Sequence, residues 1–326
     1  MKFNIITLGG ATVDITLHTD EGILIDNRED ILRQKLLAFE YGAKVKINKS
    51  SSSFGGGAAN AAVASSLLGL KSAAIVAIGD DERGKSILEN FKKKKVFSGY
   101  VKKYDSDMSG LSFLLVGQNN EHIVFSARGS NSALKLEAKD LKNLKNTEWI
   151  YLTSLSGKWE EVLNKVFTLK GVKFAWNPGH IQLSAGYKKL GKHIKKTKVL
   201  IVNKDEAIEL AISSPEYKGK EPEYFNEIQN LLRIIKKMGS EIVVVTNGQY
   251  GAHAYDGKEY YYQPVIKEKK RVDTTGVGDV FGSTFISGMI MYKGDIKKSL
   301  LLSARNTASA IGHMGAQNGL ITKKDI

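Results

Sequence analysis

The sequence predicts an α/β protein built on a doubly wound, mostly parallel sheet with helices on both faces. Short apolar strands alternate with helical patterns along most of the 326-residue chain, which is typical of such a sheet. Two mixed, polar segments interrupt the alternation, at 15–53 and 105–130. We therefore expect one domain over residues 1–326, carrying a small β lid formed by parts of those two segments.

The individual elements follow from local patterns. The apolar run from Phe3 to Leu8 predicts a strand that ends at Gly9-Gly10, and residues 56–70 predict a helix of small side chains. The apolar stretch from Val280 to Tyr292 predicts another helix. A further helix is predicted at 85–94, and further strands at 73–78, 111–116, 122–125, 149–152, 172–175, 199–202 and 242–246.

Composition and charge exclude several classes of protein. The chain has no cysteine, which rules out disulfides and thiolate catalysis. Its formal net charge is +14, but the lysines fall on predicted exposed helix faces and are not interleaved with aromatic residues. We therefore expect no nucleic-acid partner. We also expect no membrane partner and a cytoplasmic location, because no apolar run approaches the length of a membrane-spanning helix.

The most informative segment is Asp273-Thr274-Thr275-Gly276-Val277-Gly278-Asp279, directly before the predicted helix. Gly276 and Gly278 lack a Cβ, so their backbone N–H groups can approach an anion at the helix N-terminus, where the helix dipole favours negative charge. Asp279 adds a carboxylate that can accept a proton. An anion site beside a base is what phosphoryl transfer to a hydroxyl requires. The alternative is that Asp279 caps the helix and the glycines form an ordinary turn.

A second glycine loop matches the G-x-x-x-x-G-K-S pattern of a P-loop. It runs from Gly79 to Ser86, follows a predicted strand and opens a predicted helix. Its content argues against a triphosphate, because Asp80, Asp81 and Glu82 would place like charges in the phosphate cradle, at a cost of several kcal/mol with an effective dielectric of about 20. We expect ATP to bind elsewhere.

Asp273 to Phe285 resembles the second signature of the ribokinase-like, or PfkB, family of carbohydrate and nucleoside kinases. That signature reads D-T-x-G-A-G-D, and the chain departs from it only at Val277. Phe54 to Ala62 resembles the glycine-rich sugar-binding segment of the same family, and Gly79-Asp80-Asp81 continues the pattern. The resemblance covers nearly the whole chain. It implies a ribokinase-like fold and an ATP-dependent kinase that phosphorylates a hydroxyl of a sugar.

The resemblance also implies roles for individual residues. Asp279 would be the catalytic base, and the backbone N–H groups of the loop would hold the transferred phosphoryl group. Asp14 would bind the acceptor hydroxyls, although a turn or capping aspartate is an alternative reading. The N–H groups in question belong to Gly276, Val277 and Gly278. Besides Asp14, the residues that would bind the acceptor are Gly55, Gly56 and Asn60. The alternative for Asn60 is that it caps its helix.

On the nucleotide side, the resemblance implies that Asn203 reaches the phosphates and that Glu206 organises Mg²⁺ through water, which suits an ion that retains several waters. The alternative is an ordinary helix start. A nucleotide-binding turn is implied at Thr246, Gly248 and Gly251, and an adenine contact at Asn306. A monovalent cation such as K⁺ is implied at Asp273 and Thr275, with carbonyls around Ala310, His313 and Gly315.

The sequence does not identify the acceptor that is phosphorylated. Tyr151 to Ser154 lacks the glutamate that ribokinases often place after the central strand, and Gly57-Ala58 replaces their lysine-glycine pair. We predict a sugar as acceptor, with an adenosine-like nucleoside as the second candidate and a non-catalytic sugar- or nucleotide-sensing module as the third. The segment Phe39 to Lys44 would either stack on a nucleobase or pack against a partner subunit, which allows a homodimer through the lid.

Overall fold

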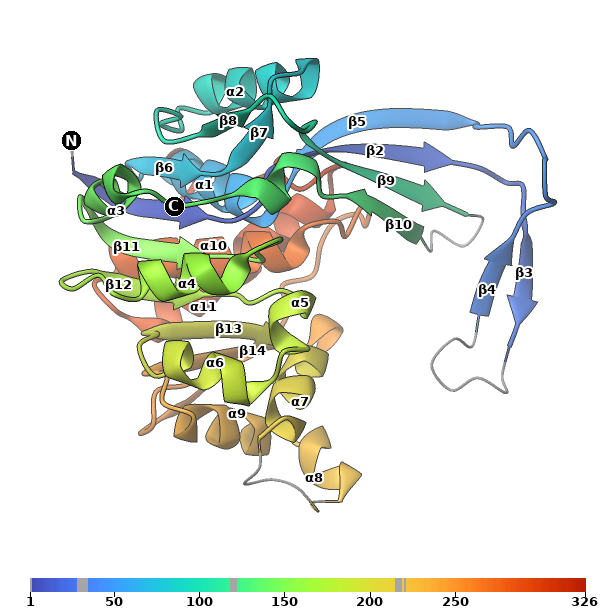
Figure 1. Ribbon diagram of the computed structural model, residues 1–326. Helices are drawn as coiled ribbons and strands as arrows, with labels where there is room; N and C mark the ends of the chain where they lie inside the picture. Colours follow the sequence, from blue (N-terminus) through green and yellow to red (C-terminus); the bar gives the residue numbers. More distant parts are fainter. Residues whose placement is uncertain (1, 28–34, 118–121, 215–218, 220) are drawn as a thin grey trace.

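The computed structural model describes residues 2–27, 35–117, 122–214, 219 and 221–326. Its centre is an eight-stranded sheet with the order β16-β15-β14-β13-β12-β11-β1-β6 (Figure 1). The strands from β6 to β14 run parallel, whereas β15 pairs antiparallel with β14 and β16 pairs antiparallel with β15. Their bounds are β1 Phe3–Leu8, β6 Ser72–Ile75, β11 Thr147–Leu152, β12 Lys173–Trp176, β13 Val199–Asn203, β14 Ile242–Thr246, β15 Ala252–Tyr255 and β16 Tyr260–Gln263.

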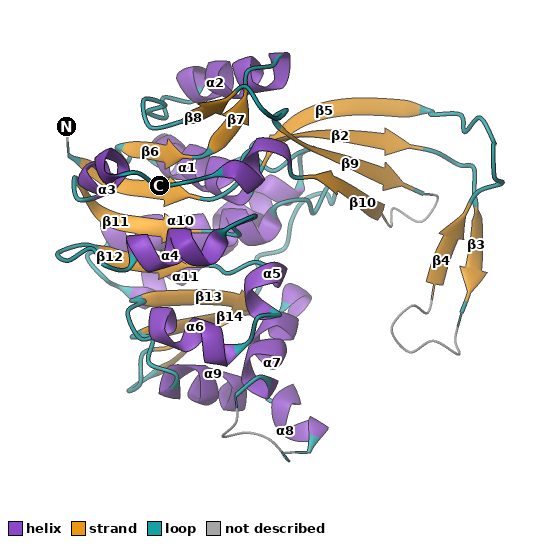
Figure 2. Cartoon of the chain, in the orientation of Figure 1, coloured by secondary structure: helices purple, strands orange, loops and turns teal. Residues whose placement is uncertain are grey.

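Helices cover both faces of this sheet, as predicted (Figure 2). Side chains alternate along β11, so that Ile150 and Leu152 pack against one helical layer while Trp149 and Tyr151 pack against the other. The first layer contains α3 Ala138–Leu144, α4 Trp159–Val166, α6 Tyr187–Ile194, α7 Lys204–Ile212 and α9 Ile228–Lys237. The second contains α1 Gly57–Leu67, α10 Val277–Met291 and α11 Ile296–Ile311. The remaining α-helices are α2 Glu82–Lys93, α5 His180–Leu183 and α8 Pro222–Asn226.

A second sheet projects from one end of the layered body (Figure 1). It has four strands in the order β10-β9-β2-β5. They come from the two segments that interrupt the alternation, and β9 and β10 form the predicted hairpin, whose turn at 118–121 lies outside the described residues. The bounds are β2 Thr12–His18, β5 Lys49–Gly55, β9 Gly110–Val116 and β10 His122–Ala127. Beyond its far end, β3 Ile23–Asp26 pairs with β4 Lys35–Ala38.

Three details differ from the sequence prediction. The predicted strand 73–78 is two strands, because β6 ends at Ile75 and β7 Ala77–Gly79 pairs with β8 Lys102–Tyr104 instead of the central sheet. The whole run is buried, so its hydrophobicity gave no sign of the break. The edge hairpin of β15 and β16 was not predicted. The last predicted helix begins earlier, at Val277.

Candidate active site

The glycine loop before α10 adopts a conformation that requires glycine at its centre. Gly276 is the N-cap of α10 with φ 70°, in the left-handed region. A Cβ at this position would lie 2.3 Å from the Cβ of Ala316, so the loop packs closely against the C-terminal segment. A Cβ at Gly278 would meet no protein atom within 4 Å. The N–H groups of the first helical turn have no partner within a helix; that of Val277 donates to the carbonyl of Thr274 at 3.3 Å, and Gly278 lines a cavity.

Asp279 lies in this first turn of α10, where it does not act as the N-cap. The N-cap is Gly276, and no side chain caps the helix. Instead, the carboxylate oxygen Oδ2 of Asp279 accepts a hydrogen bond from Nδ2 of Asn60, at 2.8 Å. Asn60 is a buried residue of α1 and does not cap its own helix either, since that N-cap is Gly56. The capping alternatives for Asp279 and Asn60 are therefore wrong.

Burial raises the pKa of the Asp279 carboxyl group above its ordinary value. The hydrogen bond from Asn60 opposes this shift because it favours the ionised form, and the negative charge of Asp14 adds to the increase. A carboxyl group with a raised pKa is a stronger proton acceptor once it is ionised. Asp279 therefore has the electrostatic character of a general base.

Asp14 lies inside strand β2, and is neither a turn nor a cap residue. It is buried, and its Oδ1 accepts a hydrogen bond of 2.8 Å from the hydroxyl of Thr12. Burial raises the pKa of the Asp14 carboxyl group, while hydrogen bonds from Thr12 and Ser112 lower it. The strand register places Ser53 and Ser112 on either side of Asp14, so this face of the second sheet carries a row of hydroxyl groups around one carboxylate.

The consecutive glycines Gly55, Gly56 and Gly57 lie between the side chains of Asp14 and Asp279. A Cβ at Gly55 would lie 2.0 Å from Oδ2 of Asp14, and one at Gly57 would lie 3.2 Å from Oδ1 of Asp279. Gly56, between them, has φ 88° and packs against the backbone of Gly10. The predicted acceptor residues Gly55 and Gly56 thus lie in a short segment whose two ends are next to the carboxylates of Asp14 and Asp279.

A cavity of about 420 Å³ opens on the other side of the glycine loop. Four of the predicted nucleotide residues line it, namely Asn203, Thr246, Gly248 and Gly251. Val277 and Gly278 also line it, so the cavity reaches the N-terminus of α10. Most of the remaining wall is apolar, as expected for a pocket that holds a nucleobase, and includes Val265, Ile266, Phe281, Ala304, Ala308 and Ile311.

Asn306 does not line this cavity, contrary to the adenine contact expected from the sequence. Its side chain is fully buried, with Nδ2 donating to the hydroxyl of Thr284 at 2.8 Å and Oδ1 accepting from the backbone of Ile321 at 2.8 Å. The next residue of α11, Thr307, lines the cavity instead, and its hydroxyl oxygen has no hydrogen-bond partner. The two residues are neighbours in α11, so their side chains point in directions about 100° apart around the helix axis.

Asn203 and Glu206 form a capping box at the start of α7. The Asn203 side chain accepts from the Glu206 backbone at 2.8 Å, and Glu206 Oε2 accepts from the Asn203 backbone at 2.9 Å. Burial raises the pKa of the Glu206 carboxyl group, and the charge of Asp279 contributes. Among the residues that the structure describes, no group of three or more His, Cys, Asp or Glu side chains is arranged to hold a metal ion.

The residues expected around a monovalent cation belong to the loop before α10, the last turn of α11 and the loop after it, and the Asp273 carboxylate joins the two loops. Its oxygens accept backbone hydrogen bonds from Thr275 and from Gly315, each at 2.8 Å. The carbonyl of Ala310 accepts from the backbone of His313 at 2.9 Å. The exposed ring of His313 is turned toward the carbonyl of Ser309, 3.0 Å away.

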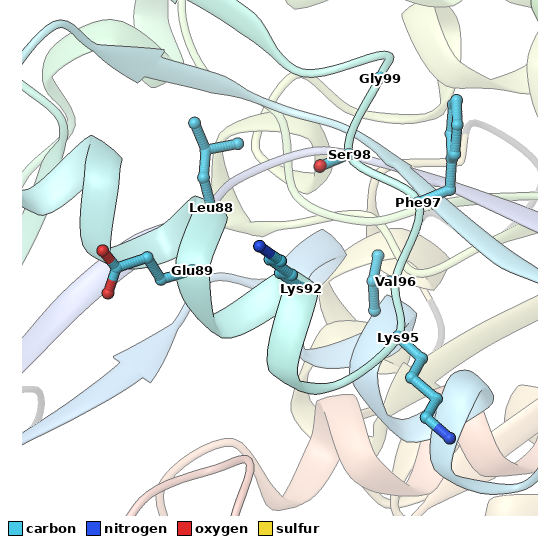
Figure 3. A pocket seen from close by; sticks show the side chains of 8 residues that line it. All are labelled: Leu88, Glu89, Lys92, Lys95, Val96, Phe97, Ser98 and Gly99. Carbon is cyan, nitrogen blue, oxygen red and sulfur yellow. The ribbon is translucent and has the colours of Figure 1, made fainter.

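The P-loop-like segment has no part in the cavity, since none of its residues from Gly79 to Ser86 lines it. Asp81 is the N-cap of α2 and accepts from Gly84 at 2.7 Å and from the Ser109 hydroxyl at 2.6 Å. Lys85 is exposed and bonded to Glu82. Figure 3 shows a separate surface hollow between α2 and residues 95–99, which contains none of the predicted site residues.

A mostly parallel α/β sheet, a nucleotide-sized cavity ending at a glycine-rich helix N-terminus and a partly buried carboxylate beside that terminus together define a nucleotide-dependent phosphotransferase. Residues 28–323 match the pfkB family of carbohydrate kinases, and the chain belongs to this family. It is thus a kinase that transfers a phosphoryl group from ATP to an alcohol group, which confirms the resemblance seen in the sequence.

Relatives and solved structures agree with this assignment. The chain is 29% identical over 300 residues to a ribokinase of Dictyostelium discoideum, covering 87% of this chain and 92% of that protein. The structure of Arabidopsis thaliana ribokinase complexed with ribose and ATP superimposes with a TM-score of 0.83 at 20% identity, over 100% of this chain and 97% of that one. A nucleoside kinase of Methanocaldococcus jannaschii gives 0.76 at 21% identity, over 99% and 96%. The predicted fold class is thereby confirmed.

Proposed function

We propose that this kinase phosphorylates a hydroxyl group of a sugar and that Asp279 is its catalytic base. The observation that carries this proposal is the position of Asp279 next to both groups of candidate site residues. It directly follows Val277 and Gly278, which line the cavity, and its Oδ1 lies 3.2 Å from the Cβ position of Gly57 in the glycine segment that leads to Asp14. A γ-phosphoryl group and an acceptor hydroxyl would meet at this residue.

The reaction then needs few protein groups. The acceptor oxygen attacks the γ-phosphorus and forms the new P–O bond, its proton passes to Asp279, and the bond to the β-phosphate oxygen breaks to release ADP. Backbone N–H groups at Gly276, Val277 and Gly278 would stabilise the charge on the transferred group. The N-terminus of α10 also favours the ionised form of Asp279 before the reaction.

The surroundings of Asp14 favour a polyhydroxylated acceptor. A carboxylate can accept two hydroxyl groups at once, and Ser53 and Ser112 beside it offer further hydrogen bonds. Tyr41, one of the two aromatic residues of the 39–44 segment, is fully exposed and does not cover Asp14. The likeness of the fold to a nucleoside kinase keeps a nucleoside as the second candidate.

We propose Mg²⁺ and a monovalent cation as further components. Glu206 fits a Mg²⁺ held mainly by water and phosphate, because its Oε2 is engaged by the Asn203 backbone while Oε1 remains for a water ligand. Such an ion would neutralise phosphate charge. The Asp273 carboxylate, between the loops at 275 and 315, fits K⁺ in that each oxygen retains a lone pair beside its one backbone hydrogen bond.

We propose that the four-stranded sheet is the lid of a single domain and that it supports a homodimer. The strands β3 and β4 beyond it expose Ile23, Leu24 and Ile25. An isolated two-stranded hairpin is marginally stable in water, so packing against a second copy would stabilise it. A cytoplasmic location fits an enzyme that uses ATP. Within the described ranges, the helices are too short or too polar to cross a membrane.

Acceptor-dependent release of ADP tests the proposed function. With ATP and Mg²⁺ fixed, a panel of sugars and nucleosides should show turnover with a polyhydroxylated sugar, and Asp14→Ala should raise the KM of that acceptor more than the KM of ATP. Preference for a nucleoside over every sugar would select the second candidate. Binding of sugar or ATP without turnover of any acceptor would select the non-catalytic sensing module.

A further inference from the structure

Three buried amide side chains lead from the surface helix α2 to Asp279. Asn90 of α2 donates from Nδ2 to Oε1 of Gln317 at 2.7 Å, and Gln317 donates from Nε2 to Oδ1 of Asn60 at 2.9 Å. Asn60 then donates to Oδ2 of Asp279 at 2.8 Å. All three amides are buried, so water does not compete for the two bonds between them. We call Asn90, Gln317 and Asn60 the amide chain.

The carboxylate fixes the direction of the amide chain. An ionised carboxylate only accepts hydrogen bonds, so Asn60 must present its NH₂ group to Asp279. Its carbonyl oxygen then faces away and needs a donor, which Gln317 provides, and the same logic applies between Gln317 and Asn90. Each amide has one orientation that satisfies both neighbours. A reversed Asn60 would place its carbonyl oxygen against the Asp279 carboxylate.

We infer that Gln317 and Asn90 are positioning residues for the reaction, because they lock the amide of Asn60 so that it holds Oδ2 of Asp279 and leaves Oδ1 to receive the acceptor proton. This inference rests on the proposed role of Asp279 as the base. Oδ1 is the oxygen that faces the glycine segment leading to Asp14, since the Cβ position of Gly57 lies 3.2 Å from it. Neither positioning residue contacts Asp279 directly.

The segment that carries Gln317 holds the glycine loop from two sides. Gly315 donates to Asp273 at one end of the loop, and Gln317 acts through Asn60 on Asp279 at the other end. Ala316, between them, packs against Gly276. The C-terminal segment therefore sets both the shape of the phosphate loop and the orientation of the base.

Loss of the amide chain should change how Asp279 titrates. The Asn60 hydrogen bond lowers the pKa of Asp279 against the effect of burial, and the charged or titratable groups that face Asp279 are Asp14 of β2, Tyr151 of β11 and Glu206 of α7. None of these three belongs to the amide chain. Weakening the Asn60 bond leaves burial and the neighbouring negative charges to dominate, so the pKa of Asp279 should rise.

Gln317→Met is the test variant because methionine keeps the length of the side chain and removes its amide. Gln182→Met is the matched control, since Gln182 is also fully buried and hydrogen-bonded but joins Leu155 and Gly179 instead. With ATP and the acceptor found in the screen, Gln317→Met should lower kcat by up to about tenfold at the acidic end of the pH profile, the size expected for a hydrogen bond to a charged group. The loss should shrink as the pH rises, and the KM of ATP should stay within about twofold.

A second measurement does not depend on turnover. In protein labelled with ¹³C at the aspartate carboxyl carbons, the Asp279 signal is identified by its absence from Asp279→Asn. Its titration should move to higher pH in Gln317→Met and, by a smaller amount, in Asn90→Leu, with no movement in Gln182→Met. If Gln317→Met does not fold, Asn90→Leu supplies the same comparison.

Equal pH profiles and equal Asp279 titrations in Gln317→Met and Gln182→Met would overturn the inference, because the amide chain would then serve packing alone. Failure of the proposed function looks different. In that case no acceptor is phosphorylated by the parent or by the control, while the carboxyl titration still decides whether the amide chain acts on Asp279.

Discussion

Two glycine loops open helices in this protein, and each contains an aspartate, yet they are built for different purposes. In the loop from Gly79 to Ser86, Asp81 accepts hydrogen bonds from the backbone of Gly84 and from Ser109. In the loop from Asp273 to Asp279, the helix is capped by Gly276, and Asp279 accepts one hydrogen bond, from Asn60. Both carboxylate oxygens of Asp81 accept hydrogen bonds that hold the loop together, whereas Oδ1 of Asp279 remains available to accept a proton.

The two aspartates also differ electrostatically. Hydrogen bonds overcome the burial of Asp81 and lower its pKa to about 2. Burial dominates at Asp279 and raises its pKa. A glycine-rich pattern before a helix therefore does not by itself identify a phosphate site. The partners of the carboxylate, and the space left at the glycines, separate a structural loop from a candidate catalytic loop.

The largest effect should come from Asp279→Asn. Asparagine keeps the size of the side chain but cannot accept the proton, so kcat should fall by at least about 10²-fold, the lower range for a general base. Because the raised pKa of Asp279 means that its ionisation at neutral pH costs stability, the melting temperature should stay the same or rise. Steady-state rates and thermal unfolding check both parts. Turnover within a few-fold of the parent would leave the base unidentified.

The next largest effects should come from alanine substitutions at Gly278 and Gly84, which should change activity in one loop and stability in the other. A Cβ at Gly278 meets no protein atom within 4 Å, so Gly278→Ala should keep the stability while crowding the phosphate, lowering kcat/KM for ATP by about tenfold. A Cβ at Gly84 would lie 2.3 Å from the carbonyl oxygen of Gly79. Gly84→Ala should therefore cost about 1–3 kcal/mol of unfolding free energy and leave kcat largely unchanged. Urea titration and initial rates measure these effects, and an exchange of the two results would reverse the assignment of the loops.

Acid should affect the two aspartates in different ways. The folded-state pKa of Asp81 is about 2, below its ordinary value of 3.8, so its contribution of about 2 kcal/mol is present above pH 4 and is lost as the pH falls toward 2. Activity should fall at higher pH than this, because protonation of Asp279 begins above its ordinary value. In Asp81→Asn, the dependence of stability on pH in this acidic range should flatten while the acidic limb of kcat keeps its midpoint.

The smallest effect should come from Lys85→Ala. Lys85 lies in the position of the P-loop lysine, but its side chain is exposed and pairs with Glu82 on the surface. Surface ion pairs contribute little, so stability, ATP affinity and turnover should all stay within about twofold of the parent. Isothermal calorimetry with ATP is the measurement. A large loss of affinity with the fold intact would restore the P-loop interpretation.

Local patterns were enough to predict the fold class, which is confirmed, and to single out candidate site residues that the structure brings close together. Strand ends followed by polar residues indicated Asn203 and Thr246, and these two residues lie side by side where the parallel strands β13 and β14 end. The glycine loop at 273–279 could be predicted because the positions of its glycines next to a helix determine its local conformation. Such features depend on neighbours in sequence, which a single chain displays directly.

Other features depend on contacts that sequence spacing does not show. Gln317 meets Asn60 across 257 residues and Asn90 across 227 residues, and nothing local distinguishes these amides from surface ones. The cavity is lined by Thr307 where the sequence predicted Asn306, and this difference has a simpler cause. Neighbouring residues of a helix point about 100° apart, so an uncertainty of one residue in the phase of α11 moves a side chain from the cavity to the core.

The most direct test of where the triphosphate binds is the response of the two loops to ATP. In protein labelled with ¹⁵N-glycine, the amide signals of Gly276 and Gly278 would be assigned with single alanine variants, as would those of Gly79 and Gly84. Addition of a non-hydrolysable ATP analogue with Mg²⁺ should shift or broaden the signals of Gly276 and Gly278, whose loop lines the cavity, and leave Gly79 and Gly84 unchanged. Shifts at Gly79 and Gly84, with Gly276 and Gly278 unmoved, would contradict the account.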